Sequence, residues 1–346
     1  MIKNFKVTNK EFKTLDIVKA LEKEYKGLEF STDDKKFIES HLPHSKWTVR
    51  FDLVKANTEL ANAFRSFVLD EIPWTRITCY MADIVTDDPR IQRMTNRVQN
   101  NIWMIPTTWV DDKDMDDIKL EISVSSGTEN RHMITSNDIK MIKGPDNFKW
   151  VKNINLAEIE PGRTFKATLA LEKDISRKNA TYCPFFQPFF KCIEFDDLSK
   201  IPSYSVMPEE YSLGFSCLDL VCSDTKWAVR HVWECIFQRL TICKTLIEEF
   251  EPKSGKLPYI SDFLKVSIQS DQKTRYEFVG ETYAIGNIIS KYGYLEDTSI
   301  DYICCGDDHP EDNNTIVKLI HPDHASLLIT GIGKAIKAVN DLAKSI

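Results

Sequence analysis

A short pattern that occurs near both ends of the chain places the strongest constraint on the fold. It reads Leu60-Ala61-Asn62-Ala63-Phe64 in one place and Ile285-Gly286-Asn287-Ile288-Ile289 in the other. Each copy lies in a predicted short helix that directly follows a predicted strand. Each then leads to further strands and a long helix, and the small residue before each asparagine lets another helix approach closely. The repeated order predicts an internal duplication, in which each half reads strand, helix, strand, strand, helix.

The first half is expected to end in a long amphipathic helix at 225–250. Its apolar residues, among them Trp233, recur mostly at steps of three or four, which places them on one helix face. An earlier helix at 57–72 can be capped by Asn57 or Thr58 and is ended by Pro73. Apolar patterning predicts three strands in this half, at 47–53, at 77–81 through Ile77, Cys79 and Met81, and at 213–221.

The second half is expected to contain a hairpin, two further strands and two helices. The hairpin joins 263–268 to 275–279, the strands lie at 299–304 and 315–320, and the helices lie at 282–292 and from about 322 to 345, with Ile336 on the buried face of the last. Each half has an apolar helical face and too few strands to cover it. We therefore expect the two halves to pair through their helices.

Changes in composition predict the domain boundaries and an α+β fold. The region 83–206 has strand-like pieces separated by Pro, Gly, Asn and Asp, which predicts an inserted β-rich domain that interrupts the first half. The remaining parts are a charged, partly helical extension at 1–44, the first paired domain at 45–82 and 207–250, a polar linker at 251–258 and the second paired domain at 259–346.

Charge and cysteine content limit the possible functions. Acidic residues outnumber basic ones by 52 to 45, so a broad face for duplex nucleic acid is disfavoured. No secretory signal or membrane-spanning run is present in the sequence, which predicts an intracellular protein with no membrane partner. The nine cysteines include no C-x-x-C pair, so we expect reduced thiols and no zinc site.

Few residues suggest catalysis, a cofactor or a metal. His309, His321 and His324, with Cys304-Cys305, could be drawn as a metal cluster, but their spacing matches no usual ligand pattern. The acidic residues around His309 are typical of a solvated turn. The aromatic stretch 183–190 could be a partner-docking patch or could pack within the β-rich domain, and both possibilities remain open. The prediction is no catalytic, cofactor-binding or metal-ligating residue, with a free-standing enzyme or an adaptor protein as the alternative.

Several motifs in the chain resemble the alpha family of multisubunit DNA-directed RNA polymerases. Leu60-Ala61-Asn62-Ala63-Phe64-Arg65, followed by Asp70-Glu71-Ile72-Pro73, resembles that family's first helix, although Ser66 replaces a second arginine. Gly280-Glu281-Thr282-Tyr283-Ala284-Ile285-Gly286-Asn287 resembles the signature of the small partner subunit, with Tyr283 in place of a histidine. The weaker matches are Asn100-Asn101-Ile102-Trp103-Met104-Ile105-Pro106, Thr135-Ser136-Asn137-Asp138-Ile139, Glu160-Pro161-Gly162-Arg163, 173–180 and His309-Pro310.

The resemblance implies a fusion of two alpha-like dimerisation domains, similar to the third-largest and eleventh subunits, to the archaeal D and L subunits, or to the bacterial alpha N-terminal domain. Such single-chain fusions are similar to those of large nucleocytoplasmic DNA viruses. The implied role is non-catalytic assembly in viral transcription, in the virion and the host cytoplasm at the viral factory. The implied partners are the second-largest, largest and other small polymerase subunits, with DNA contacted only indirectly and Mg²⁺ held by the largest subunit.

The resemblance also implies a set of subunit-interface residues. They are Leu60, Asn62, Phe64, Arg65, Glu71, Trp233, Ile285, Gly286, Asn287 and Ile336. Arg65 has two readings: the resemblance implies a contact to the second-largest subunit, whereas its neighbours in the sequence suggest a pair with Asp70 or Glu71. Helix packing by Leu60 and Asn62 should matter for assembly, so Leu60→Asp or Asn62→Lys is expected to uncouple it.

Overall fold

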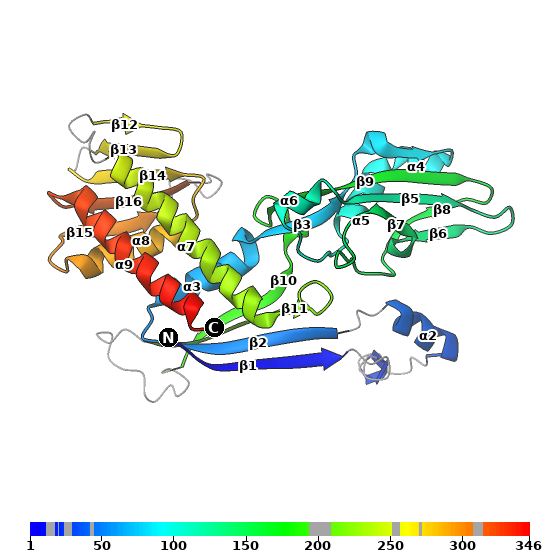
Figure 1. Ribbon diagram of the computed structural model, residues 1–346, viewed down its shortest axis with the longest axis horizontal. Coiled ribbons are helices and arrows are strands. Elements are labelled where there is room, and N and C mark those ends of the chain that lie inside the picture. Colours follow the sequence, from blue (N-terminus) through cyan, green and yellow to red (C-terminus); the bar gives the residue numbers. More distant parts are fainter. Residues whose placement is uncertain are drawn as a thin grey trace.

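The computed structural model shows a mixed α+β protein in which every paired strand of the described chain is antiparallel. This confirms the predicted fold class at that level. Figure 1 shows two sheets with their helices on one side of the molecule and a separate strand-rich part on the other. The structure describes residues 1–11, 18–19, 21–23, 30–41, 45–193, 209–250, 257–269, 272–306 and 314–346.

The first sheet has the strand order β1-β2-β11-β10. The bounds are β1 Ile2–Glu11, β2 Ser45–Val54, β10 Phe185–Cys192 and β11 Glu210–Leu218. Alternate residues of β2, from Trp47 to Leu53, are buried beneath the helices, as expected for a strand with one face on the core. β1 pairs with β2 along its length although the sequence predicts a partly helical extension there, and α2 (Thr32–His41) follows.

The second sheet repeats this order as β13-β14-β16-β15, with the short β12 added beside β13. The bounds are β12 Tyr259–Ile260, β13 Leu264–Ile268, β14 Thr274–Val279, β15 Tyr302–Gly306 and β16 Asn314–Ile320. In each sheet the strand before the short helix pairs with the strand before the long helix. The four-strand order and the direction of every pairing are therefore the same in both halves.

The helices of the two halves pack against one another. The first half contributes α3 (Thr58–Ser66), its π-helical continuation η1 (Phe67–Glu71) and α7 (Thr225–Phe250). The second contributes α8 (Tyr283–Glu296) and α9 (His324–Lys344), and α3 packs on α8 while α7 packs on α9 (Figure 1). Their apolar residues form one hydrophobic core that draws on both halves. One aromatic contact within it joins Phe64 to Trp233, with ring centroids 4.9 Å apart.

Glycine permits the closest approach between α8 and α9. A Cβ built on Gly331 of α9 would lie 2.9 Å from the backbone N of Gly293 and from the carbonyl carbon and oxygen of Tyr292. Real Cβ atoms do not approach backbone this closely, so any larger residue would force the helices apart. Gly333, two residues later, has more room, because its nearest neighbour would be Lys244 Cε at 3.8 Å.

The strand-rich part is a module with its own hydrophobic core. Its main sheet has the order β3-β9-β5-β7, with β4 also paired to β9, and β6 and β8 form a separate ribbon. The strands are β3 Pro73–Thr78, β4 Ile84–Thr86, β5 Lys119–Ser125, β6 His132–Thr135, β7 Ile139–Lys143, β8 Asn155–Ile159 and β9 Thr164–Ile175. The helices are η2 Met81–Asp83, α4 Pro89–Arg93, α5 Thr95–Trp103, α6 Asp112–Met115, η3 Ser136–Asp138 and η4 Ala180–Tyr182.

The strand pairing differs from the predicted boundaries of the inserted domain at both ends. β3 lies before the predicted start at residue 83, yet it pairs with β9 of the module. β10 lies inside the predicted range 83–206, yet it pairs with β11 in the first sheet. The predicted strand through Met81 is wrong in its placement, since the strand ends at Thr78 and Met81 begins a 3-10 turn. The strand of the first half that matches β15 is therefore β10.

Candidate functional site

The contact between the halves contains a cluster of four buried or half-buried charged side chains. Glu71 lies at the end of η1, Arg177 follows β9, Arg239 lies on α7 and Glu281 lies two residues before the start of α8. We call these four residues the seam cluster. They come from the first half, from the end of the module and from the second half, so the cluster joins three parts of the chain.

Local structure explains how Glu71 reaches this position. The side chain of Asn57 accepts a hydrogen bond from the backbone N of Leu60 at 3.0 Å and caps α3. The helix then widens into the π-helical turn, a feature that often marks functional sites, before Pro73 starts β3. The segment after β9 lies against this turn, because the backbone N of Arg177 donates to the carbonyl oxygen of Asp70 at 3.0 Å.

Ion pairs connect the four members of the seam cluster. Arg177 Nε lies 3.2 Å from one carboxylate oxygen of Glu71, and Arg239 Nη2 lies 3.9 Å from the other. Arg239 Nε lies 2.5 Å from a carboxylate oxygen of Glu281. Both arginines also donate to the carbonyl oxygen of Gly280, at 3.2 Å from Arg177 and 3.0 Å from Arg239. Arg239 is therefore the one member that contacts both carboxylates.

Burial changes the electrostatics of both carboxylates. The side chain of Glu71 is 2% exposed, and that of Glu281 is 9% exposed. Removal from water raises the pKa of Glu71 to about 7, although Arg177 and Arg239 oppose the change. Burial also raises the pKa of Glu281, again against Arg239. Two guanidinium groups therefore offset two carboxylates that would be costly to leave charged and alone.

A pH titration of stability tests the state of Glu71. Its pKa is about 7 in the folded chain and lies near its ordinary value of 4.5 when unfolded, so the folded state binds more protons between those values. We expect this group to lower the free energy of unfolding as pH rises from 5 to 8, by up to about 3 kcal/mol. The difference in unfolding free energy between wild type and Glu71→Gln, from urea titrations at pH 5, 6, 7 and 8, should fall accordingly.

The control for this titration is Glu249→Gln, which removes one carboxylate at an exposed position on α7. Its difference from wild type should stay nearly constant across the same range. A constant difference for Glu71→Gln as well would show that Glu71 ionises normally and would contradict the assignment.

The predicted interface residues other than Glu71 are either packed in the shared core or half-buried on α3 and α8. Leu60, Phe64, Trp233 and Ile285 are buried in the shared core, and Ile336 packs against it half-buried. Gly286 is required for close packing, because a Cβ there would lie 2.4 Å from Thr315 Oγ1 and 2.5 Å from Cys305 Sγ. Asn62, Arg65 and Asn287 are half-buried on α3 and α8. That any of these residues contacts polymerase subunits stays a prediction.

Arg65 forms no ion pair with Asp70 or Glu71, although all three residues lie in the described part of the chain; its contact to the second-largest subunit stays a prediction. Its Nη2 and Nε atoms donate to Asn62 Oδ1 at 3.0 and 3.2 Å. Glu71 points instead to Arg177 and Arg239. Sequence reasoning missed the seam-cluster roles of Arg177, Arg239 and Glu281. The available signal was weak: Arg239 precedes the buried Leu240 on α7, Glu281 lies just before the mostly buried start of α8, and nothing local marks Arg177.

The other candidate residues are engaged separately. His324 Nδ1 lies 2.5 Å from the hydroxyl of Tyr276, and His321 Nε2 lies 3.4 Å from Asp297. His309 and its acidic neighbours lie outside the described residues. His231 stacks on Trp227 with centroids 4.8 Å apart, and burial, assisted by Lys173, lowers the pKa of His231 to about 4. Within the described part of the chain, no group of three or more possible metal ligands is present.

The aromatic stretch 183–190 forms β10 and the turn before it. Phe185 is buried, and its ring packs 4.8 Å from that of Phe215 and 5.6 Å from that of Trp74. Phe189 and Phe190 are half-buried, with Arg50 above the Phe189 ring. The sequence left open whether this stretch docks a partner or packs within the protein. Phe185 packs within the protein, but on the first sheet rather than in the module. All nine cysteines are free thiols.

Comparisons with known proteins add no family assignment. No protein-family model matches the sequence, and no curated protein matches it significantly. None of the helices in the described residues is long and apolar enough to cross a membrane.

Proposed function

We propose that this chain is a non-catalytic assembly subunit of a DNA-directed RNA polymerase, in which two alpha-like halves pair within one chain. The observation that carries the proposal is the matched strand order, β1-β2-β11-β10 and β13-β14-β16-β15. Each half also ends in a long helix, and the helices share one core. This architecture supports the proposal because alpha-like subunits act as pairs, and the motif resemblance falls on the helices that make the pairing.

The mechanism proposed is scaffolding. Joining the halves covalently raises their effective concentration for each other and fixes their ratio at one to one. The paired halves then offer one surface to the second-largest subunit, and the largest subunit, which holds Mg²⁺, joins afterwards. The seam cluster supports this role, because its ion pairs and hydrogen bonds join the end of the module to both halves. The setting proposed is a viral factory in the host cytoplasm.

An affinity purification from the native source tests the proposal. The tagged chain should recover two very large polymerase subunits in stoichiometric amounts, with other small subunits and no separate alpha-like partner, as identified by mass spectrometry. A matched purification with the tag alone is the control. Recovery of the chain by itself would overturn the proposal and favour a free-standing enzyme or an adaptor protein.

A further inference from the structure

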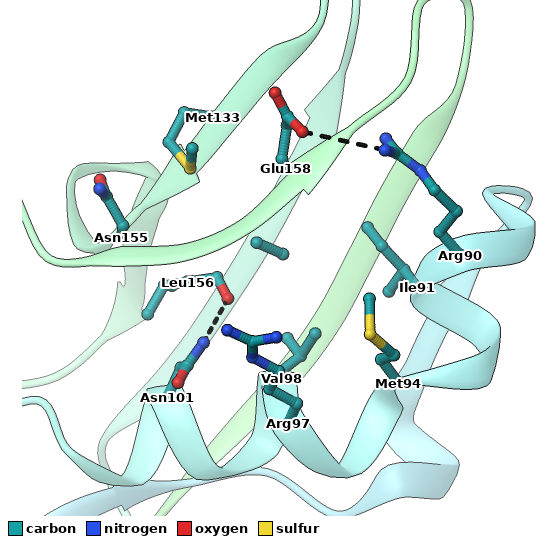
Figure 2. Close-up of a pocket in the computed structure, with 11 residues that line it drawn as sticks. Arg90, Ile91, Met94, Arg97, Val98, Asn101, Met133, Asn155, Leu156 and Glu158 are labelled. Atoms are coloured by element: carbon teal, nitrogen blue, oxygen red, sulfur yellow. Dashed lines mark hydrogen bonds and ion pairs between the residues drawn. The ribbon is translucent and has the colours of Figure 1, made fainter.

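The module contains a pocket that lies away from the seam cluster. It has a volume of about 420 Å³ and opens between the helical side of the module and the β6–β8 ribbon. Figure 2 shows Arg97 and Asn101 on α5, with Met133, Asn155 and Glu158 across from them on the strands. Its volume lies within the range of ligand pockets, so it can receive one or two side chains of a bound polypeptide.

The two arginines of the pocket differ in their ion pairs. Arg90 is held by acidic neighbours, with its Nε 3.1 Å from Glu160 and its Nη1 3.9 Å from Glu158. Arg97 is exposed and forms no ion pair with any carboxylate in the described chain. Because guanidinium groups bind carboxylates through two parallel hydrogen bonds, Arg97 offers an unused anion-binding group at the pocket.

Polar groups beside Arg97 are also partly available. Asn101 donates its amide nitrogen to the carbonyl oxygen of Leu156 at 2.8 Å, which fixes the side chain across the pocket (Figure 2). Asn155 is exposed at the start of β8. Both amides line the pocket, so it offers hydrogen-bonding groups as well as apolar surface, which suits a peptide segment more than an isolated apolar group.

The apolar part of the pocket has a buried floor and two exposed methionines. Ile91, Val98 and Leu156 are each less than 5% exposed and line the floor. Met94 is 43% exposed and Met133 is 44% exposed, one on each side of the opening. Exposed methionines adapt their shape to different apolar partners, and exposed apolar groups beside a pocket are typical of docking sites.

We propose that this pocket binds a segment of a partner protein in which a carboxylate side chain lies next to a large apolar side chain. The carboxylate pairs with Arg97, and the apolar side chain enters between Met94 and Met133. Charge complementarity selects an acidic segment, since Arg97 is the pocket arginine without a carboxylate. The inference does not depend on the polymerase proposal, because it uses only residues of the module.

A display selection of random peptides against the full chain tests the inference. Enriched peptides should carry Asp or Glu adjacent to Leu, Met or Phe. Their affinity for the Arg97→Glu variant should fall at least tenfold, and changing the peptide acid to its amide should cause a similar loss. Arg93→Glu is the matched control, because Arg93 is exposed on α4 outside the pocket lining, and it should leave binding unchanged.

Methyl NMR locates the bound peptide. With methionine methyl groups labelled, the signals of Met94 and Met133 should shift on titration, whereas that of Met104, which is 63% exposed and outside this pocket, should not. Failure to enrich any peptide would overturn the inference, as would enriched peptides that bind Arg97→Glu equally well. Equal shifts with acetate or phosphate alone would also overturn it, because they would identify a simple anion site.

Discussion

Replacing Arg239 with methionine is expected to lower the free energy of unfolding by about 3 kcal/mol at pH 8, because Glu71 and Glu281 then lose the arginine that contacts both. The loss should be smaller at pH 5, because burial raises the pKa of Glu71 to about 7 and this carboxyl group is then mostly neutral; burial shifts the pKa of Glu281 in the same direction. Urea unfolding at the two pH values measures both quantities.

The control for this change is Arg230→Met, an exposed position on the same helix. It should alter stability by less than about 0.5 kcal/mol. Adding Glu281→Gln to Arg239→Met should recover part of the loss, since one buried charge is then removed. An equal loss for both arginine variants, independent of pH, would show that the seam cluster does not stabilise the chain through paired charges.

Substituting alanine at Gly331 is expected to lower the free energy of unfolding by about 2 kcal/mol, because the new Cβ would press on the backbone of α8. The same substitution at Gly333 should raise it by about 1 kcal/mol, since alanine favours a helix and the site has room. Both variants add one methyl group to α9, so the difference between them reports the surroundings of each glycine. Thermal unfolding of both, followed by circular dichroism, provides the comparison.

The expected result is a change in unfolding free energy of opposite sign for the two glycine variants. If both glycine variants stabilise the chain, α8 and α9 are not in backbone contact at Gly331. If both destabilise it, the loss at Gly331 does not come specifically from its backbone contact with α8, because Gly333 lies on another side of α9 near Lys244.

Helices and strands with strong local patterns could be predicted from the sequence. The helix at 225–250 is confirmed at its predicted bounds, and the predicted hairpin is present as β13 and β14. β1 was missed because its residues, including Lys3, Lys6 and Lys10, are mostly exposed on a sheet edge and show little apolar alternation. The residues of β10 were assigned to the module because their sequence, with Pro188 and several phenylalanines, does not indicate which strand they pair with.

The seam cluster could be predicted only in part. Glu71 was identified through its place in a motif, but its partners Arg177 and Arg239 lie far away in the sequence. No local pattern encodes such contacts, because they depend on how the module returns to the first half. Leu60 and Phe64 were easier, since their helical spacing alone indicates a buried face.

The strand that enters the module, β3, and the strand that leaves it, β9, lie side by side where they join the first half. Pro73, which opens β3, is the register partner of Ile175, which closes β9. The chain therefore leaves the paired halves and comes back at almost the same point, beyond which β10 resumes the first sheet. An ancestral gene could have gained this whole module in one event, or a descendant could lose it, without changing the order of any strand in either half.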